Sequence, residues 1–271
     1  MEFSWELGPD DGRYLLRESA DAQATHVVVL NTLIRRPTRG RFARSRSIAP
    51  EPEPARLPLA RATIIDAVAA DSQHHAQAWL KDLDPERQSA QATAALNRVL
   101  YAHRIATADP YVHEIYPAQA IVIRVGFGAG EQVADGHFHT ARELPSARPH
   151  WQRRASALRP QERLSVLLGA RGQTLICEEL TLRARLDFDQ GRLELAALEL
   201  DRAYTRALQE LRDEQRPDLQ ARIEELERHR GAVEQLALSR QVSDLQDLRQ
   251  PLERLEAALR ARTAVGFQQQ R

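Results

Sequence analysis

The sequence is poor in cysteine, in lysine and in aromatic residues. Cys177 is the only cysteine among 271 residues, so the chain can form no internal disulfide and no zinc site built on cysteine ligands. Its neighbours Leu175, Ile176 and Leu180 are apolar, which predicts a buried thiol and not a nucleophile. Aromatic residues make up 5% of the chain, so the core must be built mainly from Leu, Ala, Val and Ile. Lys81 is the only lysine, and arginine supplies the rest of the basic charge.

Long hydrophobic runs are also missing. No stretch approaches 18 uncharged apolar residues, so we expect no membrane-spanning helix. The first residues, MEFSWELGPDDG, include acids but no basic segment, so we expect no signal peptide and a cytoplasmic location. The 38 basic and 38 acidic residues cancel, which argues against a protein that coats nucleic acid along its whole length.

Residues 1–148 predict an α+β domain with a mostly antiparallel sheet and packed helices. Phe3–Leu7 and Arg13–Arg17 flank a loop rich in glycine, proline and aspartate, which favours a β-hairpin. Further strands are predicted at His26–Ile34, Ala60–Ala67 and Ala120–Phe127. Two helices are predicted between them, one capped by Asp71 or Ser72 and one opened by Asp84-Pro85 that stops before Asp109.

Residues 149–271 predict an all-helical region. A short helix is expected from Pro160 to Leu168, followed by an αα-hairpin over about 175–213 that turns at Gly191. With Gly191 in the turn and small or apolar residues at Ala196, Leu200 and Ala203, this pair resembles one tetratricopeptide-type unit. The aromatic start and the proline end of that pattern are missing, and at least three units normally make a stable array. The sequence therefore favours an ordinary helical hairpin.

Apolar residues recur at steps of three and four along residues 217–263, as in a short coiled coil. A break near Ser239 and a proline at Pro251 predict two antiparallel helices, the second opening at Pro251. The stripe residues are Leu219, Ile223, Leu226, Val233, Val242, Leu245, Leu252, Leu255 and Leu259. Such a stripe closes the chain's own core or leaves a face for a second protein. The leading hypothesis is a non-catalytic interaction or scaffolding protein that self-associates through these side chains.

A loop at residues 35–59 is rich in arginine and proline. Its arginines lie within a dozen residues without an intervening acid, and this spacing predicts a loop that neutralises several phosphates. They are Arg35, Arg36, Arg39, Arg41, Arg44 and Arg46. The alternative hypothesis is therefore binding to nucleic acid or another polyanion through the 35–46 segment. The segment could equally be a solvated basic loop without a ligand.

The third hypothesis is an enzyme with a metal or phosphate site around residues 126–150. The Gly126–Gly136 loop follows a predicted strand, but its glycines have the wrong spacing for a dinucleotide fingerprint, and Glu131 would repel phosphate. His137 and His139 lie two residues apart, as ligands on a strand would, but no further ligand motif accompanies them. The sequence therefore favours a non-catalytic protein without a cofactor.

Overall fold

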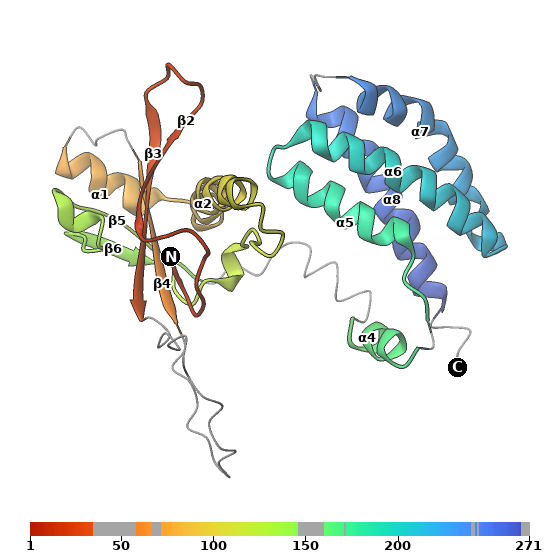
Figure 1. Cartoon of the computed structure of the whole chain (residues 1–271), viewed down its shortest axis with the longest axis horizontal. Helices are drawn as coiled ribbons and strands as arrows, with labels where there is room; N and C mark the ends of the chain where they lie inside the picture. The colour runs from red at the N-terminus through yellow and green to blue at the C-terminus, as the bar shows by residue number, and fades with distance from the viewer. Residues whose placement is uncertain are drawn as a thin grey trace, which may run out of the picture. The chain divides into compact units, whose positions relative to one another are not determined.

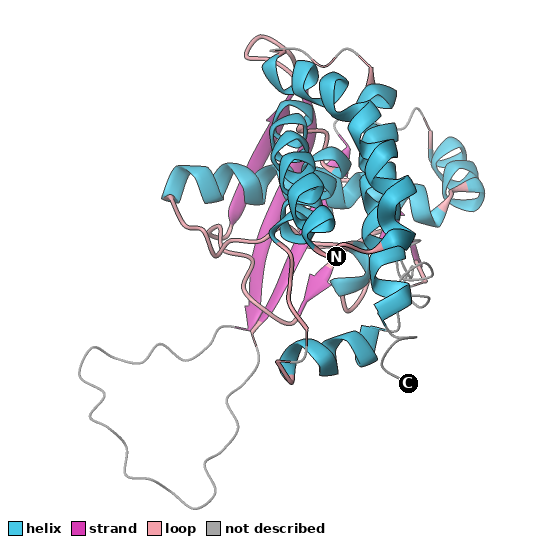
Figure 2. Ribbon diagram, turned by 90° about the vertical axis from the view of Figure 1, so that its right-hand side faces the viewer, coloured by secondary structure: helices cyan, strands magenta, loops and turns pink. Residues whose placement is uncertain are grey.

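The chain divides into two compact units, Met1–Pro149 and His150–Arg271, which we name the sheet unit and the helical unit. The structure is a computed structural model. Figure 1 labels the helices and strands, and Figure 2 distinguishes them by colour. The described residues are 1–34, 58–66, 72–145, 160–170, 172–239, 242 and 244–266.

An antiparallel sheet with the strand order β1-β4-β3-β2 forms the centre of the sheet unit. The β-branched run of β3 pairs on both sides, with β2 and with β4, as suits a strand inside the sheet. Val28 and Leu30 point to the buried face together with Ala60 and Ala62, as the period of two in a strand requires. The strands are β1 (Glu2–Phe3), β2 (Gly12–Arg17), β3 (Ala24–Ile34) and β4 (Leu59–Asp66).

The first two predicted strands do not form a hairpin, and that prediction is wrong. Glu2–Phe3 pairs with β4, and Gly12–Arg17 pairs with β3 instead. The turn-rich loop between them crosses the end of the sheet, where Asp11 Oδ1 accepts hydrogen bonds from the Thr32 backbone N–H and hydroxyl, both at 2.7 Å. The loop therefore connects the two outer strands of this sheet, and it is held in place by the central strand.

The predicted strand at Ala120–Phe127 is shorter than expected. β5 (Arg124–Phe127) pairs with β6 (Thr140–Glu143), whereas Val122 makes a single bridge to Glu2. A 3₁₀ turn at Pro117–Gln119 precedes this segment. The first half of the apolar run thus contacts β1 through one bridge, and only its second half forms a ladder, with β6.

Both predicted helices of the sheet unit begin as their capping residues indicate. α1 (Gln73–Asp82) starts after Ser72, whose hydroxyl accepts from the His75 N–H. α2 (Pro85–Thr107) starts after Asp84 and ends at Ala108, a left-handed residue with φ of 52°. α2 packs on β3 and β4 and completes the core of the unit with Leu96, Val99 and Leu100.

The helical unit is a bundle in which each long helix packs on its neighbours in sequence. α5 packs on α6, α6 on α7 and α7 on α8, and α8 returns to contact α5 and α6 (Figure 1). The helices are α4 (Pro160–Leu168), α5 (Ile176–Asp189), α6 (Leu193–Asp213), α7 (Gln220–Leu238) and α8 (Leu245–Gly266). The break near Ser239 is confirmed, since α7 ends at Leu238.

Pro251 does not open the last helix, as the sequence predicted, but lies inside α8. The helix begins at Leu245, after Asp244 Oδ1 accepts from the Gln246 N–H. Pro251 sits within the second turn of the helix, where only one carbonyl upstream loses its usual partner. Its own carbonyl accepts the hydroxyl of buried Tyr204 at 2.8 Å, so this position is fixed by a contact from α6.

Within the part of the chain that the structure describes, no helix is both long and apolar enough to cross a bilayer.

Candidate interaction surface

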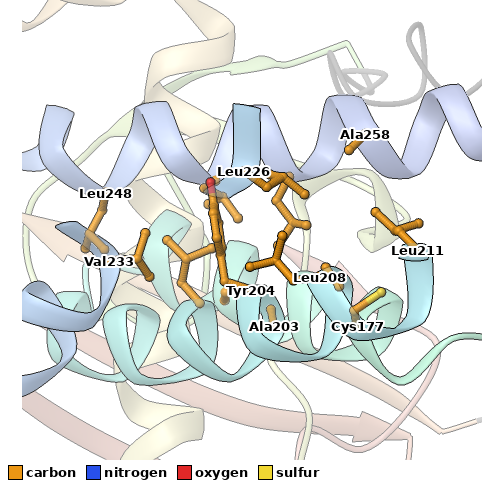
Figure 3. Packing of buried hydrophobic residues seen from close by; sticks show 14 of the residues in the cluster. Cys177, Ala203, Tyr204, Leu208, Leu211, Leu226, Val233, Leu248 and Ala258 are labelled. Atoms are coloured by element: carbon orange, nitrogen blue, oxygen red, sulfur yellow. The ribbon is translucent and has the colours of Figure 1, made fainter. Parts of the chain in front are cut away.

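The C-terminal stripe residues mostly lie inside the helical unit's own core. Leu219, Ile223, Leu226, Val233, Leu252 and Leu255 are buried, and Val242 and Leu259 are partly buried against the same cluster. Figure 3 shows Leu226, Val233 and Leu248 meeting α6 side chains such as Tyr204 and Leu208. Of the predicted interface residues, Leu245 alone is exposed. The prediction that this stripe forms the docking surface is therefore wrong for its buried members, because the helices of the same unit already cover them.

The α5–α6 hairpin forms because small side chains line its inner faces. Ala184 of α5 and Ala196, Ala203 and Ala207 of α6 are buried, so the two helix backbones can approach closely. Gly191 turns the chain with a φ of +73°, a conformation that disfavours other residues.

The start of α5 is capped from within its own hairpin. Glu210 of α6 accepts the Ile176 and Cys177 N–H groups at 3.1 and 3.0 Å, and these are donors that the helix itself leaves unpaired. The hairpin is thus fixed at both ends, by Gly191 at the turn and by Glu210 at the opening.

Four leucines remain on the outward sides of this hairpin, and we name them the leucine face: Leu182, Leu186, Leu195 and Leu198. Their exposed fractions lie between 40% and 66%. Leu182 and Leu186 are one helical turn apart on α5, as Leu195 and Leu198 are on α6. Leu186 precedes and Leu195 follows Gly191 by only a few residues, so both lie near the turn of the antiparallel pair. The core of the unit is complete without these side chains.

Charges of both signs border the leucine face. Glu179 and Arg183 form an ion pair on α5, with Oε1 and Nε 2.9 Å apart, and Glu199 and Arg202 form one on α6, with Oε1 and Nη1 3.5 Å apart. Among the buried side-chain nitrogen and oxygen atoms of the described residues, Glu199 Oε2 alone has no hydrogen-bond partner. Acids and bases thus alternate beside these leucines, and the buried Glu199 Oε2 is an unsatisfied acceptor.

A chain of alternating charges joins α4 to the end of the bundle where α5 begins, away from the Gly191 turn. Arg163 of α4 pairs with Glu178 and donates to Thr263 Oγ1 at 2.7 Å. Glu178 also pairs with Arg262, which in turn pairs with Glu214. All of these charged side chains are at most one-quarter exposed, so the contacts are more durable than surface ion pairs. α4 is thereby anchored near the start of α5 and the end of α8.

Beyond Arg163, α4 shows an apolar row to the outside. Leu164 is 48% exposed and Leu168 is 80% exposed, and their spacing of four residues puts them on one side of the helix. Neither this row nor the leucine face was among the residues that the sequence pointed to. A signal existed, because α5 and α6 carry more leucines than one buried stripe can use.

The glycine-rich loop of the sheet unit covers the sheet face that α2 leaves open. Glu131 in this loop forms an ion pair with Arg13 of β2, and the Asp135 carbonyl accepts from Arg61 Nη1 of β4 at 2.6 Å. The hydrogen bond and the charge of Arg13 hold the pKa of Glu131 below its usual range. The cavity beneath the loop measures about 160 Å³, less than the few hundred of an ordinary ligand pocket. The loop is engaged in packing against the sheet.

His137, His139 and Cys177 are the remaining residues that the sequence singled out for possible chemistry. His137 and His139 lie in the described region, in which no cluster of three or more potential metal ligands occurs. Cys177 is fully buried in the helical core. Burial, and then its hydrogen bond with Glu210, raise the pKa of this thiol far above its usual range. A thiol in this setting is a packing group and not a nucleophile.

The predicted polyanion-binding arginines, Arg35 to Arg46, lie outside the described residues. The strands on either side are described, and Ile34 pairs with Leu59. Binding of a polyanion by this segment stays a prediction.

Searches against protein-family models, curated proteins and solved structures gave no match for this chain.

Proposed function

We propose that the protein is a non-catalytic interaction protein whose helical unit pairs with a second copy of itself. The leucine face carries this proposal. Four leucines stay exposed on a bundle that has already closed its core, and burying each of them against a partner would be favourable. Large apolar side chains that stay exposed beside charged residues are a feature of many protein-binding surfaces.

A second copy suits this surface because two ion pairs, each of one acid and one base, lie beside the leucine face. In a two-fold contact the same patch meets itself, so a patch of one sign would repel its copy. Here Glu179 and Glu199 stand beside Arg183 and Arg202, and each copy offers the other both signs. A chain with one acidic or one basic border would instead favour a different partner.

Light scattering coupled to size-exclusion chromatography tests the proposal on the full chain. We expect a dimer at tens of micromolar, the range in which weak specific contacts are populated. The double variant Leu186→Glu/Leu195→Glu should be monomeric, because it places four charges in the contact. Leu238→Glu is the matched control, since Leu238 is 73% exposed on α7 and lies off the leucine face. A monomeric wild-type chain, or a double variant that dimerises as the control does, would refute the proposal.

A further inference from the structure

β2 is an outer strand of the four-stranded sheet, and one of its two edges is open. Within the residues that the structure describes, β2 pairs with β3 alone. At the opposite edge of the sheet, β1 has two residues and also bridges to Val122. A strand of six residues with one unpaired edge is long enough to receive a further strand.

Hydrogen bonds at the other side of the sheet fix the direction of the backbone groups in β3. The Met1 ammonium donates to the Ala62 carbonyl, and the Ala62 N–H donates to the Met1 carbonyl, both at 2.9 Å. The backbone groups of Ala62 thus face β1. Because these groups alternate in direction along a strand, those of Thr63 face β3, where Val29 is the ladder partner. The backbone groups of Val29 therefore face β4.

The same alternation identifies the backbone groups of β2 that point outward. Val28, next to Val29, directs its N–H and C=O toward β2, where it pairs with Tyr14. The backbone groups of Arg13 and Leu15, on either side of Tyr14, consequently point away from β3. No backbone hydrogen bond from another described residue reaches them at this edge. The sheet thus presents a donor and an acceptor at each of two alternate positions.

The side chains of these two residues lie on the sheet face that α2 leaves open. Leu15 is 58% exposed, and it ends a cross-strand row that continues through Val27 and Ile65. Arg13 lies on the same face and forms its ion pair with Glu131. The edge therefore combines an exposed apolar side chain with an arginine whose charge is already paired.

The sequence of β2 allows one register in which the strand pairs well with its own copy. Arg13 opposite itself would set like charges directly against each other. Leu15 opposite itself would place Arg13 opposite Arg17, whose carbonyl already accepts from Arg98 Nη2 at 2.7 Å. With Tyr14 opposite itself, Arg13 of each copy faces Leu15 of the other. Each outward N–H then meets an outward carbonyl, and the stem of Arg13 covers Leu15.

The two tyrosines add a contact on the buried face of the sheet. Tyr14 packs against the core of the sheet unit, and its pair across the axis would have no hydrogen bonds between the two backbones. Side chains approach most closely in such pairs, and aromatic pairs across strands are stabilising. This register is thus self-complementary on both faces of the sheet.

We propose that β2 pairs antiparallel with β2 of a second copy, with Tyr14 opposite Tyr14, so that the sheet continues through a two-fold axis. The contact goes beyond the proposed function, since it lies in the sheet unit and uses no residue of the leucine face. One pair of strands makes a small interface, and we expect a dissociation constant of roughly several hundred micromolar. At tens of micromolar the contact is therefore sparsely populated.

Disulfide trapping tests the register. All proteins are full-length and carry Leu186→Glu/Leu195→Glu, which keeps the leucine face out of the result. Arg13→Cys and Leu15→Cys proteins are oxidised alone and as a mixture. We expect at least about fivefold more linked dimer in the mixture, because residues 13 and 15 of different copies lie opposite each other with Cα atoms about 5.5 Å apart. Identical positions lie on a diagonal of about 7–8 Å, beyond the reach of a disulfide.

A mixture of Arg13→Cys with Leu238→Cys is the control for random collision, since Leu238 is 73% exposed on α7. Buried Cys177 stays in place in every protein. Linked dimer no more abundant than in this control overturns the proposal. More linked dimer in Arg13→Cys or Leu15→Cys alone than in their mixture overturns it as well, because another register is then formed. Light scattering of the wild type measures the leucine face separately, so either proposal can fail alone.

Removing one outward N–H is the second arm. Leu15→Pro deletes a donor that takes no part in the ladder with β3, whereas Leu15→Val keeps it. In the same background, sedimentation equilibrium at several hundred micromolar should show association at least about tenfold weaker for Leu15→Pro. Far-UV circular dichroism checks that both variants are folded, and the trapping result decides if Leu15→Pro is not. Equal association of the two folded variants overturns the proposal.

Discussion

The sheet unit and the helical unit hold distant parts of the chain by different means. In the sheet unit, single buried polar side chains fix long connections: Asn97 of α2 donates to the Ile115 carbonyl at 2.9 Å and accepts the Ile115 N–H at 2.8 Å. In the helical unit, the helices meet through a continuous apolar core, and charges are placed at its ends. A single polar substitution should therefore damage the sheet unit more than the helical unit.

The largest effect is expected from Asn97→Ala. The change leaves both backbone groups of Ile115 buried without their present partner, at about 1–3 kcal/mol for each group, and we expect a loss of roughly 2–4 kcal/mol. Urea unfolding followed by tryptophan fluorescence measures it, since two of the three tryptophans, Trp5 and Trp79, belong to the sheet unit. Gln91→Ala on the exposed side of the same helix is the control and should change stability by at most about 0.5 kcal/mol. Equal losses in the two variants would contradict the comparison.

A smaller effect is expected from Tyr204→Phe in the helical unit. The variant keeps the ring in the core and removes only the hydrogen bond to the Pro251 carbonyl, so we expect a loss of about 1–2 kcal/mol. Thermal unfolding monitored at 222 nm reports on the helices. Tyr111→Phe serves as the control because Tyr111 is almost fully exposed. If Tyr204→Phe lowers the free energy of unfolding as much as Asn97→Ala does, the sheet unit is not the more sensitive of the two to the loss of a buried polar group.

Glu2→Gln should lower the free energy of unfolding by about 1 kcal/mol near neutral pH, and by less in acid. Burial alone would raise the pKa of Glu2, but its hydrogen bonds and charge pairing with Arg61, and then with Arg124, lower it instead. The carboxylate therefore stabilises the folded chain fully above the unfolded pKa of about 4.3, and this advantage is lost as the pH falls through the lower folded pKa.

Urea titrations of wild type and Glu2→Gln at several pH values check this dependence. Exposed Glu6→Gln is the control. A difference between wild type and Glu2→Gln that stays constant down to pH of about 3 would be inconsistent with the lowered pKa.

The smallest effect is expected at Cys177. Because its side chain is buried and its pKa is raised, a thiol reagent at pH 8 should leave the folded chain essentially unmodified. In urea the thiol should react at once. The reaction followed by absorbance thus reports opening of the helical core, and rapid modification without denaturant would show that this core opens far more easily than its packing indicates.

Much of the helical unit could be predicted from the sequence because its contacts are local. Pro160, Gly191 and the break near Ser239 lie at the ends of helices, and the boundaries follow from capping and turn chemistry. The sheet unit was harder because strand partners lie far apart in the chain. Nothing in residues 1–17 indicates that Phe3 pairs with Ala60 and not with its neighbour across the glycine-rich loop.

The candidate surface was misplaced for a different reason. A stripe such as Leu219 to Leu259 shows that a helix face is covered, but not which partner covers it. Here the partners are the other helices of the same unit, chiefly α6 for α7, and α5, α6 and α7 for α8. Pro251 misled because proline fits the first position of a helix, and nothing in the sequence shows that α8 already begins at Leu245.

The pairing of Ile34 with Leu59 has a practical consequence. The ladder between β3 and β4 extends to these residues, so the pairing of the two strands does not depend on the length of chain that joins them. Protein engineers could exchange the connecting segment for a short turn or graft a reporter peptide there, and the ladder between β3 and β4 would supply the scaffold.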